Sequence, residues 1–521
     1  MRMLFRRWRR VPGLSGMEPC VLGGDIPKVE LTFGSPLPLA SRIHLRHAAT
    51  DAANAAMMAD SELAVLPGLF QRARLAWTKA KGIGLPDREL GINTQRDGVS
   101  QYNSSSSAVA VEHTCEQVPR SEREAAEKRS PRILFAVHVS RDGDTAVYKN
   151  TRDRVAYLEQ QGCQCTILSP EDFPWTQRFG ARFTPFSYPV ALALWLFRRA
   201  DAFDLASFHS YAGWVVLSLS RLFGRFRRLR TAIQFHGLEP LYYSRLEANA
   251  RREGRPLSWR YRLVSGRIMI HLLRHACRRA DMVLCLNSEE LRFLVENGWA
   301  KSDRVHLVVN PASTSFFIER QYRPRATRLL FVGQWLNMKG TRCLVEAFTQ
   351  LHREHPDVQL SCAGTLANAE TVRRDFPPEV RQQISVLARV SKSELLKLHR
   401  DADLFVFPTL SEGFSLALIE AMASGLPIVT TAVGASPDIL EDGRSVVFCP
   451  VNEARKLAAC VADLLDDQAR REQLGRNARR AAEKFRPDGV WRDYATCLNR
   501  LAQSDLEQHY RIRVASFRER D

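Results

Sequence analysis

The sequence lacks a long apolar run, a hydrophobic leader and a paired-cysteine motif. No window reaches ~18 consecutive apolar residues, the minimum for a membrane-spanning helix, because even the run 190–197 ends at Arg198 and Arg199. The first twelve residues carry five arginines, but no apolar run follows them, so we expect no secretion signal. The eleven cysteines are odd in number and form no CxxC pair, which argues against a disulfide framework and a structural zinc site. These absences predict a cytoplasmic protein without a metal site.

The composition is that of a globular protein. The chain has 521 residues, of which 45% are hydrophobic, 9% aromatic and 25% charged, so two or three packed domains are expected and collagen or wholesale disorder is excluded. The net charge is +18, and counting by segment gives +4 for 1–130, +11 for 131–320 and +3 for 321–521. A basic middle third suits nucleic acid, an anionic membrane surface or a phosphorylated substrate, and a solvated arginine-rich surface is the alternative.

Short apolar runs of strand length alternate with helical stretches from residue 132 onward. Residues 1–130, rich in small and polar side chains, predict a poorly ordered leader and linker. The alternation predicts an α/β fold with two doubly wound Rossmann-like domains, 131–315 and 325–486, and ligands at the carboxyl ends of the strands. A helix over 487–505 is expected to return to the first domain, before a tail over 506–521. The predicted strands are 133–139, 164–168, 205–209, 231–235, 282–286, 305–309, 329–332, 359–363, 384–387, 404–407, 428–430 and 446–448.

The stretch 408–427 carries the most chemical information. It follows a predicted strand, turns at Gly413 and continues as good helix formers until Gly425, a residue type that favours a helix end. The start of this helix, with its free amides and positive dipole end, predicts an anion site that a diphosphate could occupy. Glu412 precedes the helix and Glu420 lies within it, eight residues apart. Their carboxylates could accept hydrogen bonds from sugar hydroxyls, the alternative being two incidental glutamates on a helix.

These motifs resemble the donor-site signature of the retaining glycosyltransferases of family 4, which have the GT-B fold. The two glutamates, the following Glu420–Pro427 segment and Ala432–Asp438 carry the resemblance, which extends over about 131–505. Further matching segments, in the expected order, are Phe235–Gly237, Ala280–Asp281, Asn287–Ser288, Phe331–Gly340, Ala363–Gly364, Val390–Leu396 and Ala402–Phe405. The resemblance implies two Rossmann-like domains facing across a cleft.

The family's residue roles transfer by resemblance to matching positions. Glu412 is expected against the transferred sugar and Glu420 on the ribose, while Lys339 matches the diphosphate-binding lysine and His236 a histidine near the donor sugar. The family's partner arginine is replaced by Gln334, whose neutral amide cannot provide a bidentate charge. The remaining expected donor-site residues are Gly413, Phe414 and Ser415 through their amides, Gly364 where relatives have a Gly-x-Gly turn, and Val390.

Two further residues are expected on the acceptor side. Gly143 falls where relatives place a glycine-rich turn, and His209 ends a predicted strand, although packing alone would also account for His209. The run Arg221–Arg230 interleaves aromatic residues with arginines and could contact anionic lipid headgroups, with a solvated helix end as the alternative. Peripheral association with the inner face of a membrane is therefore expected as an extension of the cytoplasmic prediction.

The resemblance implies a metal-independent hexosyltransferase without a cofactor. It would move a sugar from a nucleotide-diphosphate sugar to a glycan or lipid-linked acceptor, with retention at the anomeric carbon, in polysaccharide or cell-envelope glycan biosynthesis. Two rival functions remain open at this point. A dinucleotide-dependent oxidoreductase would need a GxGxxG turn after a first strand, and none is present. A nucleic-acid-binding or scaffolding protein would use the basic middle third, but no specific nucleic acid is expected.

Overall fold

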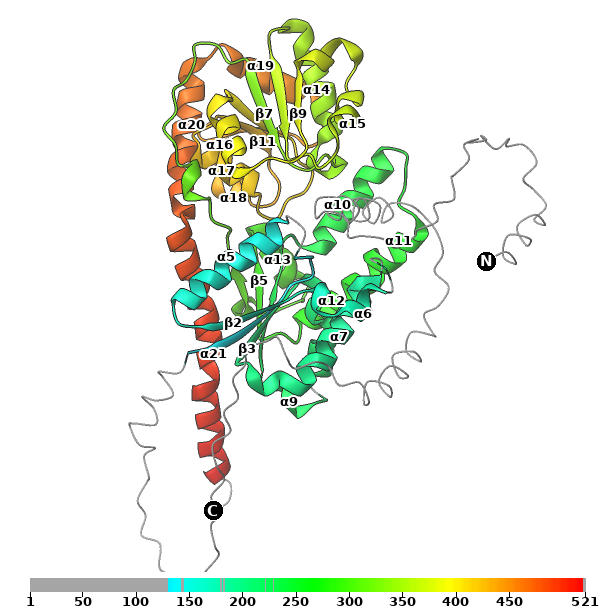
Figure 1. Ribbon diagram of the computed structural model, residues 1–521, viewed down its shortest axis with the longest axis vertical. Coiled ribbons are helices and arrows are strands. Elements are labelled where there is room, and N and C mark those ends of the chain that lie inside the picture. Colours follow the sequence, from blue (N-terminus) through cyan, green and yellow to red (C-terminus); the bar gives the residue numbers. More distant parts are fainter. Residues whose placement is uncertain are drawn as a thin grey trace, which may run out of the picture. The chain divides into compact units, whose positions relative to one another are not determined.

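The computed structural model describes residues 130–141, 145–178, 180, 183–220, 222–227 and 229–518 (Figure 1), with side chains described as far as Ala502. All of them belong to one compact unit, Asp60–Asp521. The predicted leader before Ser130 and the candidate residue Gly143 lie outside the described residues, so both remain predictions.

Twelve strands form two six-stranded sheets in which all neighbouring strands are parallel (Figure 1). Each predicted strand is present, and the largest deviation is the first strand, which ends three residues earlier than expected. The first sheet has the order β2-β1-β3-β4-β5-β6 and the second the order β12-β11-β10-β7-β8-β9. The strands are β1 (Arg132–Ala136), β2 (Gln164–Leu168), β3 (Leu205–His209), β4 (Arg230–Gln234), β5 (Met282–Cys285), β6 (Val305–Leu307), β7 (Arg328–Val332), β8 (Gln359–Ala363), β9 (Ile384–Leu387), β10 (Leu404–Phe407), β11 (Ile428–Thr431) and β12 (Val447–Cys449).

The helices between the strands cover the sheets, as the parallel topology requires. They are α5 (Ala146–Gln160), α6 (Pro174–Gln177), α7 (Thr184–Arg199), α8 (Trp214–Leu219), α9 (Gly224–Arg227), α10 (Glu239–Arg252), α11 (Trp259–Leu263), α12 (Ile270–Cys277), α13 (Ser288–Glu296), α14 (Thr341–Glu354), α15 (Ala369–Arg374), α16 (Lys392–Asp401), α17 (Leu416–Ala423), α18 (Ser436–Ile439), α19 (Ala454–Leu465), α20 (Gln468–Ala482) and α21 (Pro487–Arg518). Within the described ranges, none of the helices is both long enough and apolar enough to cross a bilayer.

Several helix predictions differ from the structure. The helix expected over 487–505 is α21, which runs from Pro487 to Arg518 and so includes most of the expected tail over 506–521. The helix expected over 213–222 is only α8, because Ser210–Gly213 forms a tight 3₁₀ turn before it. The helix expected over 267–279 begins earlier, as a π-helical segment at Val264–Met269 that continues into α12. Periodicity alone does not distinguish these helix types, because their side-chain repeats differ little over one or two turns.

Each sheet has one topological switch point, where successive connections run in opposite directions along the sheet. In the second sheet it lies between β7 and β10, the two central strands, and in the first sheet between β1 and β3. Open α/β sheets bind ligands beside the carboxyl ends of the strands at such points. The loops after β7 and β10 contain Lys339 and Glu412, respectively.

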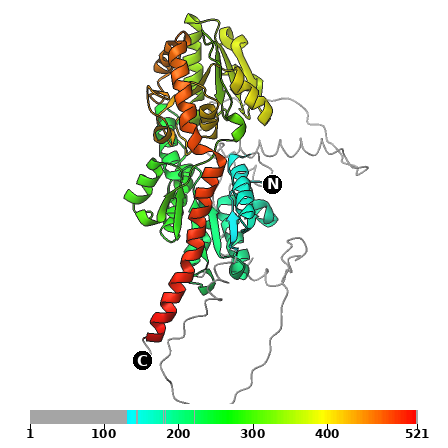
Figure 2. The same cartoon turned by 90° about the vertical axis from the view of Figure 1, so that its left-hand side faces the viewer.

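The two sheets have separate apolar cores, and α21 packs on the first. The second core includes both faces of β7 and β10 as well as α14, α17 and α19. Tyr494 and Leu498 of α21 are buried in a cluster with Ile133 and Leu205 of the first sheet, and Tyr494 Oη donates a hydrogen bond to Gln234 Oε1 at 3.1 Å. Figure 2 shows α21, in red, continuing the chain from α20 of the second domain alongside the strands of the first.

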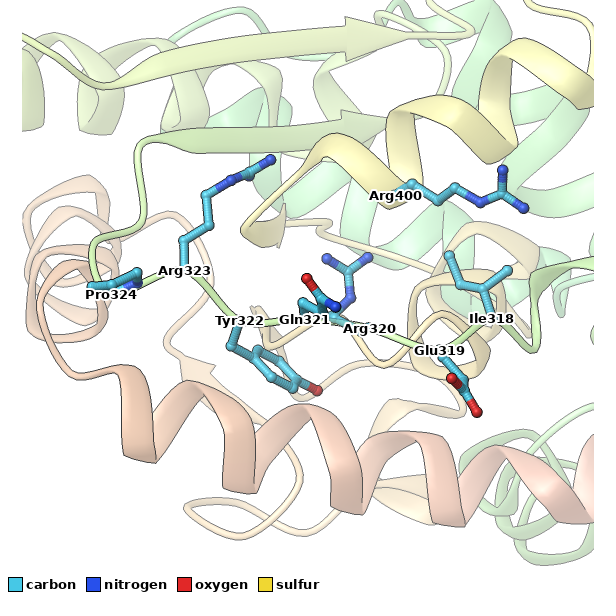
Figure 3. A pocket seen from close by; sticks show the side chains of 8 residues that line it. All are labelled: Ile318, Glu319, Arg320, Gln321, Tyr322, Arg323, Pro324 and Arg400. Carbon is cyan, nitrogen blue, oxygen red and sulfur yellow. The ribbon is translucent and has the colours of Figure 1, made fainter.

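The linker between the sheets is bonded to the end of α17. Its residues 318–324 line a cavity of about 430 Å³ together with Arg400 (Figure 3). Arg320 donates to the carbonyls of Ser424 at 2.9 Å and Ala402 at 2.7 Å, and Tyr322 Oη donates to the carbonyl of Gly425 at 2.8 Å. This cavity contains none of the predicted site residues, so its larger volume does not make it the candidate active site.

Candidate active site

A second cavity, of about 250 Å³, is lined by residues that follow strands of both sheets. Four of the residues predicted from the sequence line it: His236, Lys339, Glu412 and Gly413. His236 follows β4, Lys339 follows β7, and Glu412 and Gly413 follow β10. Residues up to 177 positions apart in sequence are thus brought together, because parallel strands place their carboxyl ends at one edge of each sheet. The other lining residues are Gly237, Leu238, Glu239, Leu241, Tyr242, Arg245, Glu290 and Ser411.

Lys339 and Glu412 form an ion pair at the switch point of the second sheet. Lys339 Nζ donates a short hydrogen bond to Glu412 Oε1, and Thr409 Oγ1 lies 3.3 Å from the same oxygen. The loops that carry the pair are bonded to each other, since Leu410 N donates to the carbonyl of Met338 at 2.9 Å. Both side chains are mostly buried, with 27% of Lys339 and 13% of Glu412 exposed. The site therefore presents a cation and a carboxylate whose positions are fixed by main-chain contacts.

The loop before α17 is held by hydrogen bonds to its carbonyl and N-cap groups, which leave its amide N–H groups available to bind a ligand. The helix begins at Leu416, three residues later than the glycine at which the sequence places its start, because Ser415 is its N-cap and accepts from Leu418 N at 3.3 Å. The carbonyl of Gly413 accepts from Asn287 Nδ2 at 2.9 Å and from Ala435 N at 3.0 Å. In the described part of the chain, the N–H groups of Gly413, Phe414 and Ser415 find no acceptor. Such amides at a helix start suit an anion.

Glu420 lies on α17 but does not line the cavity around Glu412. Its side chain is half-buried, and no donor among the described residues bonds to its carboxylate. Burial raises the pKa of Glu420 to about 7, although the positive charges of Lys392 and Lys149 oppose this shift. Since α17 begins at Leu416, Glu412 lies in the loop before the helix and Glu420 lies within it, as the sequence predicts. An unpartnered carboxylate is still suited to accept hydrogen bonds from hydroxyl groups.

His236 reaches the cavity, whereas His209 is fully buried behind it. His236 Nε2 and His209 Nδ1 are 2.8 Å apart, and the ring centroids are separated by 4.8 Å. His209, predicted on the acceptor side, has no exposed surface and does not line the cavity. Burial is the main cause that lowers the pKa of both histidines, so both rings are neutral at pH 7.

Sequence reasoning missed several charged residues of the cavity. Glu239 begins α10, accepts a short hydrogen bond from Ser210 Oγ, and has a pKa raised to about 7 by burial. Its Oε2 atom is buried without a partner in the described ranges. Arg245 pairs with Glu289 at 2.6 Å and lies 3.4 Å from Ser411 Oγ. The position of Glu239, just after a predicted strand and its Phe-His-Gly turn, could have indicated a site residue. Nothing in the sequence indicates that Arg245 contacts Ser411, which is 166 positions away.

The remaining predicted donor residues lie on the same edge of the second sheet but not in this cavity. Gln334 follows β7 and is exposed. Gly364 follows β8 with φ +67° and donates from its amide to the carbonyl of Leu387 at 2.8 Å. Val390 follows β9 and is half-buried. Phe414 is buried, with its ring 5.6 Å from that of Phe485.

No metal cluster is formed by the residues described. The part of the chain that the structure describes contains no group of three or more His, Cys, Asp or Glu side chains arranged to hold a metal ion. Its nine described cysteines are free thiols; six of them are buried in the apolar clusters and the other three pack against these clusters.

Comparison with protein families assigns both halves of the described chain. The family described as Glycosyltransferase Family 4 matches residues 151–316, and the family described as Glycosyl transferases group 1 matches residues 317–481. Together the two matches cover 151–481, which includes every strand except β1 and every lining residue of the cavity. The fold and the site therefore define an α/β protein of GT-B architecture. This chain belongs to the group 1 glycosyltransferases.

Curated relatives and solved structures are consistent with this family. D-inositol 3-phosphate glycosyltransferase of Corynebacterium kroppenstedtii is 28% identical over 37% of this chain and 44% of its own length, and glycogen synthase of Mycobacterium tuberculosis is 32% identical over 34% and 43%. The chain thus spans less than half the length of these relatives. Sucrose-phosphate synthase of Thermosynechococcus elongatus has a TM-score of 0.59 at 19% identity, over 72% of this chain and 100% of that one. The Anabaena protein HepE with UDP and glucose has a TM-score of 0.52 at 15% identity, over 71% and 99%. At these identities the structures support the fold alone, and the oxidoreductase and nucleic-acid alternatives are not favoured.

Proposed function

We propose that this protein transfers a hexose-type sugar from a nucleotide-diphosphate sugar to a hydroxyl of a glycan or lipid-linked acceptor, with retention at the anomeric carbon. The observation that carries the proposal is the Lys339–Glu412 pair at the switch point of the second sheet, in one cavity with His236. HepE, which shares the fold, was solved with UDP and glucose, and this supports a nucleotide-sugar donor. The glycosyltransferase and glycogen synthase among the relatives support a role in glycan biosynthesis.

In this proposal the donor diphosphate binds between Lys339 and the free amides of Gly413, Phe414 and Ser415. Hydrogen bonds to a charged group contribute ~1.5–3 kcal/mol each, so an ammonium and three amides provide enough binding for a diphosphate. Without a ligand, Lys339 is bonded to Glu412. A diphosphate competes for the ammonium group and leaves the Glu412 carboxylate free to accept from sugar hydroxyls. Glu420, which lacks a described donor, accepts from the ribose.

The transfer step follows from this arrangement. The bond between the anomeric carbon and the diphosphate oxygen breaks as the acceptor oxygen bonds to the same face of that carbon. The acceptor proton passes to an oxygen of the departing phosphate, so the step needs no protein base. Lys339 and the amides stabilise the charge that develops on the diphosphate, a type of contribution that typically changes rates by ~10²–10³ per donor. The proposal assigns this task to the protein without a metal ion.

The acceptor side of the proposal belongs to the first domain. Glu239 lines the cavity with one carboxylate oxygen that lacks a described partner, so it is suited to accept from an acceptor hydroxyl. A lipid-linked acceptor would bring the first domain to an anionic membrane surface. The segment before and within α9 fits that contact, because Leu222 is 75% exposed beside Phe223 and Arg225. This part of the proposal implies a protein at the cytoplasmic face of a membrane.

The proposal is tested by ligand binding and then by transfer. Thermal shift with UDP-, GDP- and ADP-sugars should give one donor that raises the melting temperature, since a ligand at 100 times its Kd stabilises by about 2.7 kcal/mol. With that donor, Glu412→Ala and Glu420→Ala should each lower transfer about 100-fold or more while the protein stays folded. Glu354→Ala, an exposed glutamate on α14, is the matched control. Near wild-type transfer by both site variants would refute the assignment.

A further inference from the structure

Two histidines from neighbouring strand ends form a pair at the cavity, with His236 lining it and His209 fully buried behind His236. β3 and β4 are in register, with His209 opposite Gln234, and His236 follows two residues later. His236 Nε2 is bonded to His209 Nδ1, so its remaining ring nitrogen, Nδ1, is the one left for a ligand. Among the residues described, the one hydrogen bond of the His236 ring is through Nε2, which leaves Nδ1 without a partner. The direction of the hydrogen bond between the two rings therefore decides whether His236 Nδ1, the nitrogen left for a ligand, carries an N–H or a lone pair.

The surroundings of His209 set that direction. His209 Nε2 is buried without a partner in the described part of the chain. Nearby lies Arg154, a guanidinium with no exposed surface that packs against the rings of Trp491 and Tyr494 and donates to Asn310 Oδ1 at 3.0 Å. Its charge helps to lower the pKa of both His209 and His236. The positive charge of Arg154, which disfavours protonation of His209, favours a ring lone pair over a ring N–H at Nε2.

Each neutral imidazole carries one N–H and one lone pair. If the lone pair of His209 is at Nε2, its proton is at Nδ1 and is donated to His236 Nε2. The proton of His236 must then be at Nδ1. His138, whose ring centroid is 6.3 Å from that of His236, adds no positive charge at pH 7, because burial lowers its pKa to about 4.

We propose that His209 is a positioning residue that fixes the tautomer of His236, so that an N–H group and not a lone pair faces the cavity. This inference rests on the proposed function for the identity of the partner, which would be an oxygen of the donor sugar or its phosphate. A ring N–H donates a hydrogen bond to such an oxygen and cannot take a proton from an acceptor hydroxyl. His236 thus binds and orients, in agreement with a reaction in which the departing phosphate receives the proton.

The tautomer can be measured without any substrate. In protein labelled with ¹⁵N at histidine, long-range ¹H–¹⁵N correlation distinguishes protonated from unprotonated ring nitrogens, and the signals of His236 are those lost in His236→Gln. We expect a protonated Nδ1 and an unprotonated Nε2. A protonated Nε2 in the wild-type protein would overturn the proposal.

Two variants of His209 separate positioning from packing. His209→Leu removes the donor and should give averaged signals for both nitrogens of His236, whereas His209→Asn places an amide N–H near the position of Nδ1 and should retain the wild-type pattern. His399→Asn is the matched control, because His399 is also fully buried but bonds to Ser424, away from the cavity. An unchanged His236 tautomer in His209→Leu would refute the role of His209.

A binding measurement keeps this test apart from that of the function. Calorimetric titration with UDP, GDP and ADP examines the proposed donor site and does not depend on the tautomer. The expected tautomer with no binding of any diphosphate would contradict the proposed function and leave the tautomer inference standing. Binding of a diphosphate together with the opposite tautomer of His236 would support the proposed function and contradict the tautomer inference.

Discussion

Gly340, directly after Lys339, offers a quantitative test of how the site loops are held. Its φ is +75°, in the left-handed region, and a Cβ atom built on it would lie 1.8 Å from the carbonyl oxygen of Pro408. Pro408 begins the loop that carries Glu412. Gly340→Ala therefore forces a left-handed alanine and also pushes the two site loops apart.

The expected cost has two parts. A non-glycine residue in the left-handed region costs ~1–2 kcal/mol, and overpacking that requires the backbone to shift adds ~1–3 kcal/mol. Gly443→Ala is the matched control, because Gly443 has φ +71° but no atom within 4 Å of the added Cβ. We expect Gly340→Ala to lower the free energy of unfolding by ~1–3 kcal/mol more than Gly443→Ala does.

Urea denaturation followed by circular dichroism measures the difference, since both glycines belong to the second domain. Binding of the preferred nucleotide diphosphate should weaken in Gly340→Ala and stay unchanged in Gly443→Ala, because only the former displaces Lys339 from Glu412. Equal destabilisation by the two substitutions would refute the close approach of Gly340 to Pro408 on which the argument depends.

Two further predictions concern charge. Burial raises the pKa of Glu420 from 4.5 to about 7, so its contribution to the free energy of unfolding falls as the pH rises from about 4.5 to 7 and stays low above that range. Glu420→Gln removes this dependence, and its stability relative to wild type should increase between pH 5 and pH 8 in urea titrations; a constant difference would contradict the buried carboxylate. The membrane contact proposed around α9 predicts that Leu222→Glu lowers sedimentation with phosphatidylserine-containing vesicles, whereas Leu307→Glu, half-exposed at the end of β6, does not. Binding to phosphatidylcholine vesicles alone would point to apolar adsorption, and equal losses in both variants would count against the assigned surface.

The strands were predictable because buried parallel strands are short apolar runs. Phe405, Val406 and their neighbours in β10 are buried on both faces, so the whole run is apolar and stands out from the polar loops around it. The order of the strands along each sheet was not predicted, because right-handed crossovers narrow the possible orders without selecting one. The start of α17 was less predictable, because the sequence places the beginning of the helix at the turn at Gly413, whereas Ser415 is the N-cap.

The candidate site was predictable only where a residue follows its own strand. Lys339, His236 and Glu412 each lie in a loop after a strand, so the topology alone brings them to the ligand edge. Arg245 has no such signal, because it lies within α10 and reaches Ser411 only where α10 approaches the loop after β10, which is distant in sequence.

Two glycines explain how side chains from both sheets reach one cavity. Gly237 follows His236, and Gly413 follows Glu412. A Cβ atom on Gly413 would lie 2.9 Å from Cα of Gly237, closer than packed carbon atoms allow, so the two loops approach each other at main-chain distance. Any side chain at Gly413 would separate His236 from Glu412 by moving the loops that carry them. Gly237 and Gly413 thus lie where the two loops meet at main-chain distance, and this contact leaves no room for a side chain at Gly413. The contact explains why a glycine follows Glu412, which the chemistry of His236 and Glu412 does not explain.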